Sequence, residues 1–261
     1  MVDALTFRLL GQGIAYSASP AMMNAAFGAL GLPHRYVLAD VPPDGVAATV
    51  ARLREAGSGG ANVTVPHKAA VAAAMDELSD VAREAGAVNT VVRVGRRLVG
   101  HNTDFPATVE AVERLRPDGV GHALVLGAGG VSRAVQLALL KVGAERVTVL
   151  RRSDGSIDRL TEAIAEADLV VNATPVGTGT DETLVPAELL RHDLAVLDLV
   201  YRPSPTRLVR EARAIGAPAA SGAAILLGQA WRSLELWLGV PAPVEAMRSA
   251  LESELGAAAG V

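Results

Sequence analysis

Short apolar runs alternate with longer amphipathic stretches along almost the whole chain. Residues 5–11 predict a strand, and a helix is expected over residues 19–31, with Ser19 as its N-cap and proline at its first position. Residues 36–41 predict a second strand, and residues 44–56 a second helix. The chain therefore starts with alternating strands and helices, which is typical of an α/β fold.

The next segment predicts a third strand and then a hairpin. Residues 61–65 are apolar apart from an asparagine and a threonine, and a helix is expected after Pro66. Valines alternate with other residues on both sides of Gly95, so residues 87–104 predict two antiparallel strands that turn at this glycine.

The pattern changes at residues 104–106, which we take as a domain boundary. HALVLGAGGVSRAVQLALL predicts a strand, a glycine turn and a helix, and VTVLRRS, DLVVNATP and LAVLDLVY predict further short strands with helices between them. This succession favours a parallel sheet with right-handed crossovers. The chain is expected to be helical from Gly222 onward and to fray over residues 256–261.

Composition narrows the possible functions. The 261 residues are half hydrophobic but only 3% aromatic, which predicts an aliphatic core in one large domain or two modest ones. A net charge of −4 argues against nucleic acid as the main partner. The lack of cysteine excludes disulfides, thiolate zinc sites and a cysteine nucleophile, and the five histidines show no short ligand spacing. Without a long apolar run or a signal-peptide pattern, we expect a soluble cytoplasmic protein.

A glycine turn follows the apolar strand at residues 122–126. Gly127, Gly129 and Gly130 let the backbone approach a pyrophosphate, and the following helix offers free N–H groups. Such turns also use glycine for steric reasons alone. Where NAD enzymes carry an acid after the second strand, this chain has Arg151 and Arg152, which suit a 2′-phosphate. Together these features favour NADP over NAD, although a solvated basic turn has the same composition.

Four polar clusters in the first half lie at or beside the ends of predicted strands, where α/β sheets collect ligand-binding groups. Serine hydroxyls near a helix N-terminus suit a carboxylate, asparagine and threonine suit ring hydroxyls, and a lysine beside an aspartate suits proton transfer to an oxygen. Each residue alone also has a structural explanation, such as a helix cap, a turn residue or a solvated lysine. Together they predict a site for a small polyol acid. The clusters are residues 17–20, 62–68, 88–90 and 102–104.

These motifs resemble those of the shikimate dehydrogenase family over most of the chain. GQGIAYSASP resembles the family's G-x-P-I-x-H-S-x-S-P motif, and GANVTVPHK resembles G-x-N-V-T-x-P-x-K. GAVNT and GHNTD resemble the next two motifs. GAGG, RR, NATPVGT, DLVYRPSPT and LLGQA then follow in the family's order.

The resemblance implies a role for each matching residue. Lys68 and Asp104 would be the catalytic pair, with Lys68 as the acid/base at the substrate oxygen. The substrate residues would be Ser17 and Ser19 at the carboxylate, Thr64, Asn89 and Gln229 at the ring hydroxyls, Tyr201 near the substrate and the nicotinamide, and also Asn62. The cofactor residues would be Gly127, Ala128, Gly129 and Gly130 at the diphosphate, Arg151 and Arg152 at the 2′-phosphate, and Asn172, Ala173, Thr174, Val200 and Gly222 along the cofactor cleft.

The resemblance also implies the fold and the reaction. An N-terminal α/β substrate-binding domain, residues 1–105, would be completed by C-terminal helices over residues 230–261, and residues 106–229 would form a Rossmann-like NADP-binding domain. The enzyme, a monomer or homodimer, would reversibly reduce 3-dehydroshikimate with NADPH, a step of aromatic amino-acid biosynthesis.

The chain departs from the family pattern at several positions that border the implied pocket. Gly13 and Tyr16 replace a proline and a histidine, Met23 replaces a histidine, Leu150 stands in place of asparagine and Thr178 in place of methionine. These changes leave quinate or an aminoshikimate-type acid open as the substrate, although Ser19 favours shikimate. A sensor that binds shikimate or NADP without turnover is a further alternative. The retained Lys68 and Asp104 argue against it.

Overall fold

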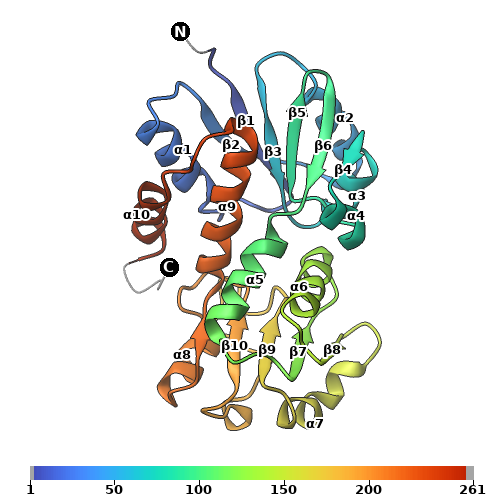
Figure 1. Cartoon of the computed structure of the whole chain (residues 1–261), viewed down its shortest axis with the longest axis vertical. Helices are drawn as coiled ribbons and strands as arrows, with labels where there is room; N and C mark the ends of the chain where they lie inside the picture. The colour runs from blue at the N-terminus through green and yellow to red at the C-terminus, as the bar shows by residue number, and fades with distance from the viewer. Residues whose placement is uncertain (1–2, 257–261) are drawn as a thin grey trace. The chain divides into compact units, whose positions relative to one another are not determined.

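The computed structural model describes residues 3–256, which form two compact units (Figure 1). The first unit comprises the chain up to Thr103 together with Leu227–Glu254, and the second is built mainly from Asp104–Leu226. Each unit contains one sheet flanked by helices, so the predicted α/β class is confirmed. The frayed tail was expected over residues 256–261, and all of these except Gly256 lie outside the described part of the chain.

The sheet of the first unit has six strands in the order β2-β1-β3-β5-β6-β4. Strands β1, β2 and β3 are parallel, and β5 runs antiparallel to both β3 and β6. The hairpin predicted around Gly95 is present, and this glycine has a φ of 64° that few other residues adopt. The strands are β1 (Thr6–Gly11), β2 (Arg35–Asp40), β3 (Ser58–Val63), β4 (Glu77–Leu78), β5 (Thr90–Val94) and β6 (Arg97–His101).

Two helix predictions for this unit need correction. Ser19 is not the N-cap but the first helical residue, because Ala18 holds the cap position without a side-chain hydrogen bond. The helix predicted over 44–56 is a 3-10 turn, Pro43–Gly45, followed by a helix that ends at Arg52, where the next N–H groups bond to carbonyls three residues back. The helices of this unit are α1 (Ser19–Ala29), α2 (Val46–Arg52), α3 (Lys68–Ala73), α4 (Asp80–Ala85), α9 (Gly222–Leu238) from Leu227 onward, and α10 (Val244–Leu255).

The two faces of the first sheet are packed differently. Leu10 belongs to an aliphatic cluster with Val50 and Val63. Phe7 points to the opposite face, because successive strand residues alternate, and its ring lies 5.1 Å from Phe27 and 4.7 Å from Trp237. Phe7, Phe27 and Trp237 thus pack together on one face, where the indole of Trp237 donates to the Val91 carbonyl (3.0 Å).

The second unit contains the predicted parallel sheet, with five strands in the order β11-β10-β9-β7-β8 and all pairs parallel. Aliphatic clusters cover both faces, as expected for a sheet flanked by helices on each side. The strands are β7 (His122–Leu126), β8 (Arg146–Leu150), β9 (Leu169–Asn172), β10 (Ala195–Asp198) and β11 (Ala219–Ala220), and the helices are α5 (Asp104–Leu115), α6 (Gly130–Lys141), α7 (Leu160–Ala165) and α8 (Arg207–Ala214), with 3-10 turns at Ser156–Arg159 and Ala187–Leu189.

Candidate active site

The polar clusters of the first unit gather at one edge of its sheet. Strands β1 and β3 are parallel, and β3 and β6 are both antiparallel to β5, so β1, β3 and β6 all end at the same edge. Ser17 follows β1, Lys68 follows β3 and Thr103 follows β6. Asn89 reaches this edge from the other direction, because it comes just before β5, whose first residue pairs with the end of β3.

The turn after β3 places Lys68 at the start of α3. The Thr64 N–H donates to the Leu10 carbonyl (2.8 Å) and the His67 N–H to the Thr64 carbonyl (2.9 Å). Gly11 leaves room for this turn, because a Cβ on it would lie 2.5 Å from Cγ2 of Thr64. The Lys68 side chain is buried, although lysine usually lies at the surface. A buried lysine at a strand end is a functional-site candidate.

His67 has a role that the sequence did not reveal. Its side chain is buried, and Nε2 donates to the Val41 carbonyl (2.7 Å). The Val41 N–H in turn donates to the Gly11 carbonyl (2.8 Å). His67 therefore fastens the turn that carries Lys68 to the connection after β2. Nothing in the local sequence indicates this bond, which joins residues 26 positions apart.

Asn62 lies at the centre of a buried hydrogen-bond network. Its Oδ1 accepts from the Tyr36 hydroxyl (2.9 Å), and its Nδ2 lies within hydrogen-bond distance of Ser233 Oγ (2.9 Å), the Asn89 carbonyl (3.1 Å) and Thr90 Oγ1 (3.2 Å). Both ends of the amide are thus engaged within the protein. Asn62 thus has four bonding partners within the protein, and its contact with substrate stays a prediction.

The same network orients Asn89 beside Gln229. The Asn89 Oδ1 accepts from the Thr103 N–H (2.7 Å), and its Nδ2 donates to Thr103 Oγ1 (2.9 Å) and lies 3.5 Å from Oε1 of Gln229. Gln229 is on α9, far along the chain but in the same unit. Ser233, one turn later on this helix, contacts Thr90 Oγ1 (2.8 Å). Thr90 lies in the predicted polar cluster 88–90, whereas Ser233 was not predicted, although it stands four residues after Gln229 and so shares its helix face.

The serine cluster is shaped by local bonds. The Ser19 N–H donates to Ser17 Oγ (3.3 Å), and the Ser17 N–H donates to the Ile14 carbonyl (3.0 Å). The loop before them is anchored by the Gly13 N–H, which donates to Asp40 Oδ1 (3.0 Å). Ser19 is buried and Ser17 half-buried.

Asp104 is buried, and it is the first residue of α5 and of the second unit, directly after Thr103 in the chain. The Thr108 hydroxyl donates to its carbonyl (2.8 Å), which closes the first turn of the helix.

The predicted cofactor residues of the second unit lie at or after the ends of parallel strands, at one edge of its sheet. The glycine turn follows β7, Arg151 follows β8, Ala173 follows β9, and Val200 and Tyr201 come soon after β10. The carboxyl edge of such a sheet is the usual place for a dinucleotide.

The glycine turn has the geometry that an anion site needs. Gly127 has a φ of 105°, and a Cβ there would lie 2.9 Å from the Ala173 carbonyl oxygen, so only glycine fits. Gly129 faces open space. Helix α6 begins at Gly130 without a side-chain cap, so the helix itself leaves its first N–H groups available to a phosphate.

The two arginines after β8 are both exposed, but they have different neighbours. Nε of Arg151 lies 3.6 Å from Oδ2 of Asp154. The pKa of Asp154 is lowered, mainly by a hydrogen bond from the Ser156 hydroxyl, so this carboxylate stays charged and competes for Arg151. Arg152 has no ion pair within residues 3–256. It is therefore the more available cation for a 2′-phosphate.

Asn172 and Asp198 shape the turns after β9 and β10. Asn172 donates to Asp198 Oδ1 (2.9 Å), and its Oδ1 accepts from the hydroxyl (2.7 Å) and N–H (3.1 Å) of Thr174. Asp198 also accepts from the Val200 N–H (3.0 Å) and the Thr206 hydroxyl (2.6 Å), and burial raises its pKa. Sequence analysis missed Asp198, although it opens the DLVY motif.

Gly222 allows α9 to start against the loop that carries Val200 and Tyr201. Its N–H donates to the Val200 carbonyl (3.2 Å), and a Cβ would lie 2.2 Å from the Leu199 carbonyl oxygen. The close packing of these two backbones therefore requires glycine at this position.

Two features are absent from residues 3–256. No group of three or more histidine, aspartate or glutamate side chains in this range is arranged to hold a metal ion. No helix in the same range combines the length and apolarity needed to cross a membrane.

Comparison with known proteins gives a consistent result. Residues 9–91 match the family described as shikimate dehydrogenase substrate binding domain, and residues 222–252 match the shikimate 5'-dehydrogenase C-terminal domain. The chain is 41% identical to a protein of Symbiobacterium thermophilum named shikimate dehydrogenase (NADP(+)), over 93% of this chain and 92% of that protein. It is 37% identical to the protein of the same name from Pyrococcus abyssi, over 96% and 98%.

Solved structures extend the likeness to the fold. Shikimate 5-dehydrogenase from Thermus thermophilus, in complex with NADP(H) and shikimate, has a TM-score of 0.87 at 39% identity and covers 96% of this chain and 100% of its own. Quinate dehydrogenase from Corynebacterium glutamicum, in complex with NAD, has a TM-score of 0.84 at 31% identity, with 97% and 100% covered.

Proposed function

Since the chain belongs to the shikimate dehydrogenase family, we propose that it is an NADP-dependent oxidoreductase that interconverts shikimate and 3-dehydroshikimate by hydride transfer. The reaction is a step of aromatic amino-acid biosynthesis. The observation that carries this proposal is the alignment over nearly the full chain with relatives named shikimate dehydrogenase (NADP(+)). The proposed reaction uses two small water-soluble molecules, which suits a cytoplasmic enzyme. A monomer or homodimer is proposed as its assembly.

Lys68 and Asp104 are the proposed catalytic pair. NADP supplies the hydride-transfer chemistry when bound. During reduction, the Lys68 ammonium donates a proton to the substrate oxygen that gains charge, and during oxidation the amine takes it back. Asp104 is the second group of the proposed pair. The burial of Lys68 and its fixed place at the start of α3 support this role.

Binding of the acid substrate is assigned to the polar edge of the first unit. Ser17 and Ser19 hold the carboxylate, and Thr64, Asn89 and Gln229 hold the ring hydroxyls. The 3.5 Å between the amides of Asn89 and Gln229 supports a shared task for these two residues. We assign Asn62 the role of positioning Asn89, because its own amide is engaged within the protein.

Binding of the cofactor is assigned to the carboxyl edge of the second sheet. The backbone of residues 127–130 holds the diphosphate, and Arg152, assisted by Arg151, holds the 2′-phosphate. Tyr201 lies near the nicotinamide in this proposal. Asn172, Ala173, Thr174, Val200 and Gly222 form the wall behind the cofactor.

Quinate is the second candidate substrate. The quinate dehydrogenase of Corynebacterium glutamicum has the same fold at 31% identity, so the fold alone does not separate the two acids. That protein was solved with NAD, whereas this chain has two adjacent arginines where NADP is expected. Ser19 and the arginines therefore favour shikimate with NADP.

A substrate panel tests the proposal. Shikimate, quinate and an aminoshikimate are each supplied with NADP⁺ or NAD⁺, and the reduced nicotinamide is followed by its absorbance. We expect kcat/KM for shikimate with NADP⁺ to exceed every other combination by about tenfold or more, which corresponds to roughly 1.4 kcal/mol. A higher kcat/KM for quinate would reassign the substrate. Absence of turnover across the panel would favour a binding protein without catalysis.

A further inference from the structure

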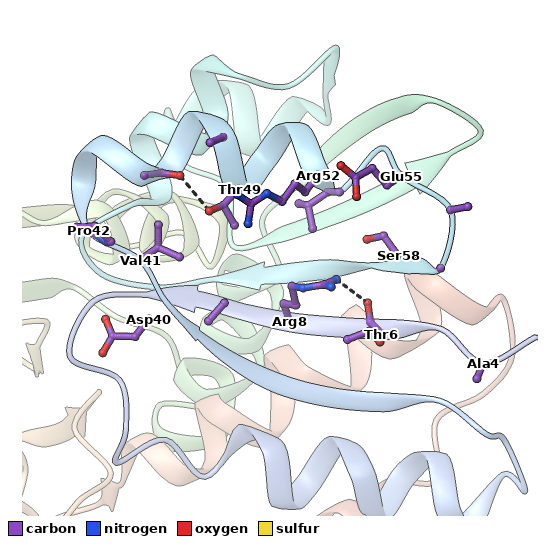
Figure 2. Close-up of a pocket in the computed structure, with 16 residues that line it drawn as sticks. Ala4, Thr6, Arg8, Asp40, Val41, Pro42, Thr49, Arg52, Glu55 and Ser58 are labelled. Atoms are coloured by element: carbon purple, nitrogen blue, oxygen red, sulfur yellow. Dashed lines mark hydrogen bonds between the residues drawn. The ribbon is translucent and has the colours of Figure 1, made fainter.

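A second pocket of about 660 Å³ lies within the first unit, between helix α2 and the sheet (Figure 2). Its walls come from β1, the connection after β2, α2 and the start of β3, and it includes none of the residues assigned to substrate or cofactor. Pockets that bind small molecules typically have volumes of about 300–1,000 Å³. The pocket is therefore large enough for a metabolite, and it is separate from the proposed active site.

The pocket exists because α2 is too short to cover its side of the sheet. Leu10 of β1 packs with Leu53 in the aliphatic core. Thr6 and Arg8 face the same side as Leu10 but are polar and only half-buried. Val37, which pairs with Arg8 on this face, is 37% exposed. The face of β1 thus changes from the apolar Leu10 to the polar Arg8 and Thr6, and α2 does not cover the polar stretch.

Two arginines line the pocket from opposite walls. Figure 2 shows Arg8 on strand β1 and Arg52 on helix α2, with the space of the pocket between them. Nη1 of Arg8 donates to the Thr6 carbonyl (3.1 Å), which steadies the side chain. Within residues 3–256, Arg52 has neither a hydrogen bond nor an ion pair through its side chain. Two guanidinium groups are well suited to hold a carboxylate or phosphate.

Ser58 is an independent sign of a ligand. Its side chain is 4% exposed, and its Oγ has no hydrogen-bond partner. Ser58 pairs with Thr6 across parallel strands and so faces the same side of the sheet. Figure 2 shows its hydroxyl directed into the pocket. A buried hydroxyl without a partner is costly, and a ligand oxygen in the pocket would satisfy it.

The pocket walls are held in place by bonds within the protein. Asp40 accepts from the Gly13 N–H (3.0 Å), the Val41 N–H donates to the Gly11 carbonyl (2.8 Å), and the Thr49 hydroxyl donates to the Gly45 carbonyl (2.9 Å). These bonds hold the walls in place before a ligand arrives, and only the Ser58 side chain, whose Oγ is closed to solvent, has to turn to meet a ligand oxygen.

We propose that this pocket binds a small organic anion, whose carboxylate or phosphate lies between Arg8 and Arg52 and accepts a hydrogen bond from Ser58. The pocket is larger than inorganic phosphate requires, so an organic body is expected, resting on the apolar lining that includes Ala39 and Val41. Glu55, exposed at the rim, favours a ligand that also carries a hydroxyl or ammonium donor.

Calorimetric titration of the full chain with citrate, glycerol 3-phosphate and glutamate tests this site. Shikimate and NADP⁺ are kept saturating, and the titration is repeated without them. We expect at least one probe to bind saturably with one site per chain. The R8Q/R52Q variant should weaken binding more than about tenfold, and S58A about threefold. The matched control R83Q/R97Q removes two charges from arginines that are 63% and 61% exposed and lie outside the pocket, and it should bind as the wild type does.

The titrations either support or overturn the proposed anion site. Saturable binding of glycerol 3-phosphate alone, or of the carboxylates alone, identifies the anionic group and supports the site. If none of the probes binds saturably, or if R83Q/R97Q weakens binding as much as R8Q/R52Q, the proposal is overturned. The readout is binding and not turnover, so this result stands apart from the test of the proposed dehydrogenase activity.

Discussion

Replacing Asn62 by alanine is expected to lower the free energy of unfolding of the first unit. The effect on the KM for shikimate should be much smaller. The side chain is 4% exposed, and Tyr36, Ser233, Asn89 and Thr90 surround its amide at 2.9 to 3.2 Å. Alanine removes these bonds and leaves buried partners without them. The loss should appear first as a lower free energy of unfolding.

The magnitude follows from the number of bonds. The amide has two N–H donors and accepts one bond from Tyr36, so about three hydrogen bonds are lost at once. A net contribution of about 1 kcal/mol for each gives a loss of roughly 3 kcal/mol. For a protein of this size, such a loss lowers the melting temperature by about 6–12 °C.

Urea unfolding followed by tryptophan fluorescence measures this loss, because Trp231 and Trp237 both lie in the first unit. The S233A variant and the double variant N62A/S233A complete a double-mutant cycle. We expect a coupling energy of about 1 kcal/mol, since the two side chains share a 2.9 Å bond. A loss below about 1 kcal/mol together with a tenfold higher KM for shikimate would refute the reasoning and return Asn62 to the substrate.

Three other changes have expected outcomes. R152Q should raise the KM for NADP⁺ about tenfold and leave NAD⁺ nearly unaffected in steady-state kinetics, and equal effects on both cofactors would place the 2′-phosphate elsewhere. G222A should sharply lower the melting temperature, because its Cβ would lie 2.2 Å from the Leu199 carbonyl oxygen; an unchanged value would contradict this packing. The pKa of Asp76 is lowered in the folded protein, chiefly by a hydrogen bond from Arg54. The ionised carboxylate therefore stabilises the fold above its ordinary pKa of 3.8, and this contribution is lost as the pH falls through the lower pKa of the folded state. D76N should therefore flatten the fall in unfolding free energy below that pH, and an unchanged slope would rule out this contribution.

Most strands and helices could be predicted in their order along the chain, as could the strand ends beside which most candidate site residues lie. Alternating valines around Gly95 identified the hairpin, and the glycine turn after residues 122–126 identified the first strand of the parallel sheet. These features follow from local periodicity and from glycine at turns, which a single segment of sequence contains in full.

Features that depend on distant partners could not be predicted. The bond between Asn62 and Ser233 joins residues 171 positions apart, and no local pattern identifies it. Serine is a favoured N-cap residue, yet Ser19 is already the first helical residue and Ala18 holds the cap position. The two-residue strands at 77–78 and 219–220 are too short to show a period and form because a neighbouring strand offers a free edge.

The proposed reaction depends most on proton transfer between Lys68 and the substrate oxygen. The direct measurement compares K68A with the wild type, with kcat for shikimate oxidation from steady-state kinetics and the dissociation constant of shikimate from calorimetry. We expect kcat to fall by at least about 100-fold while the dissociation constant changes less than about threefold, because the interaction strengthens in the transition state. A kcat close to that of the wild type, or an equal loss in kcat and in binding, would contradict the assignment.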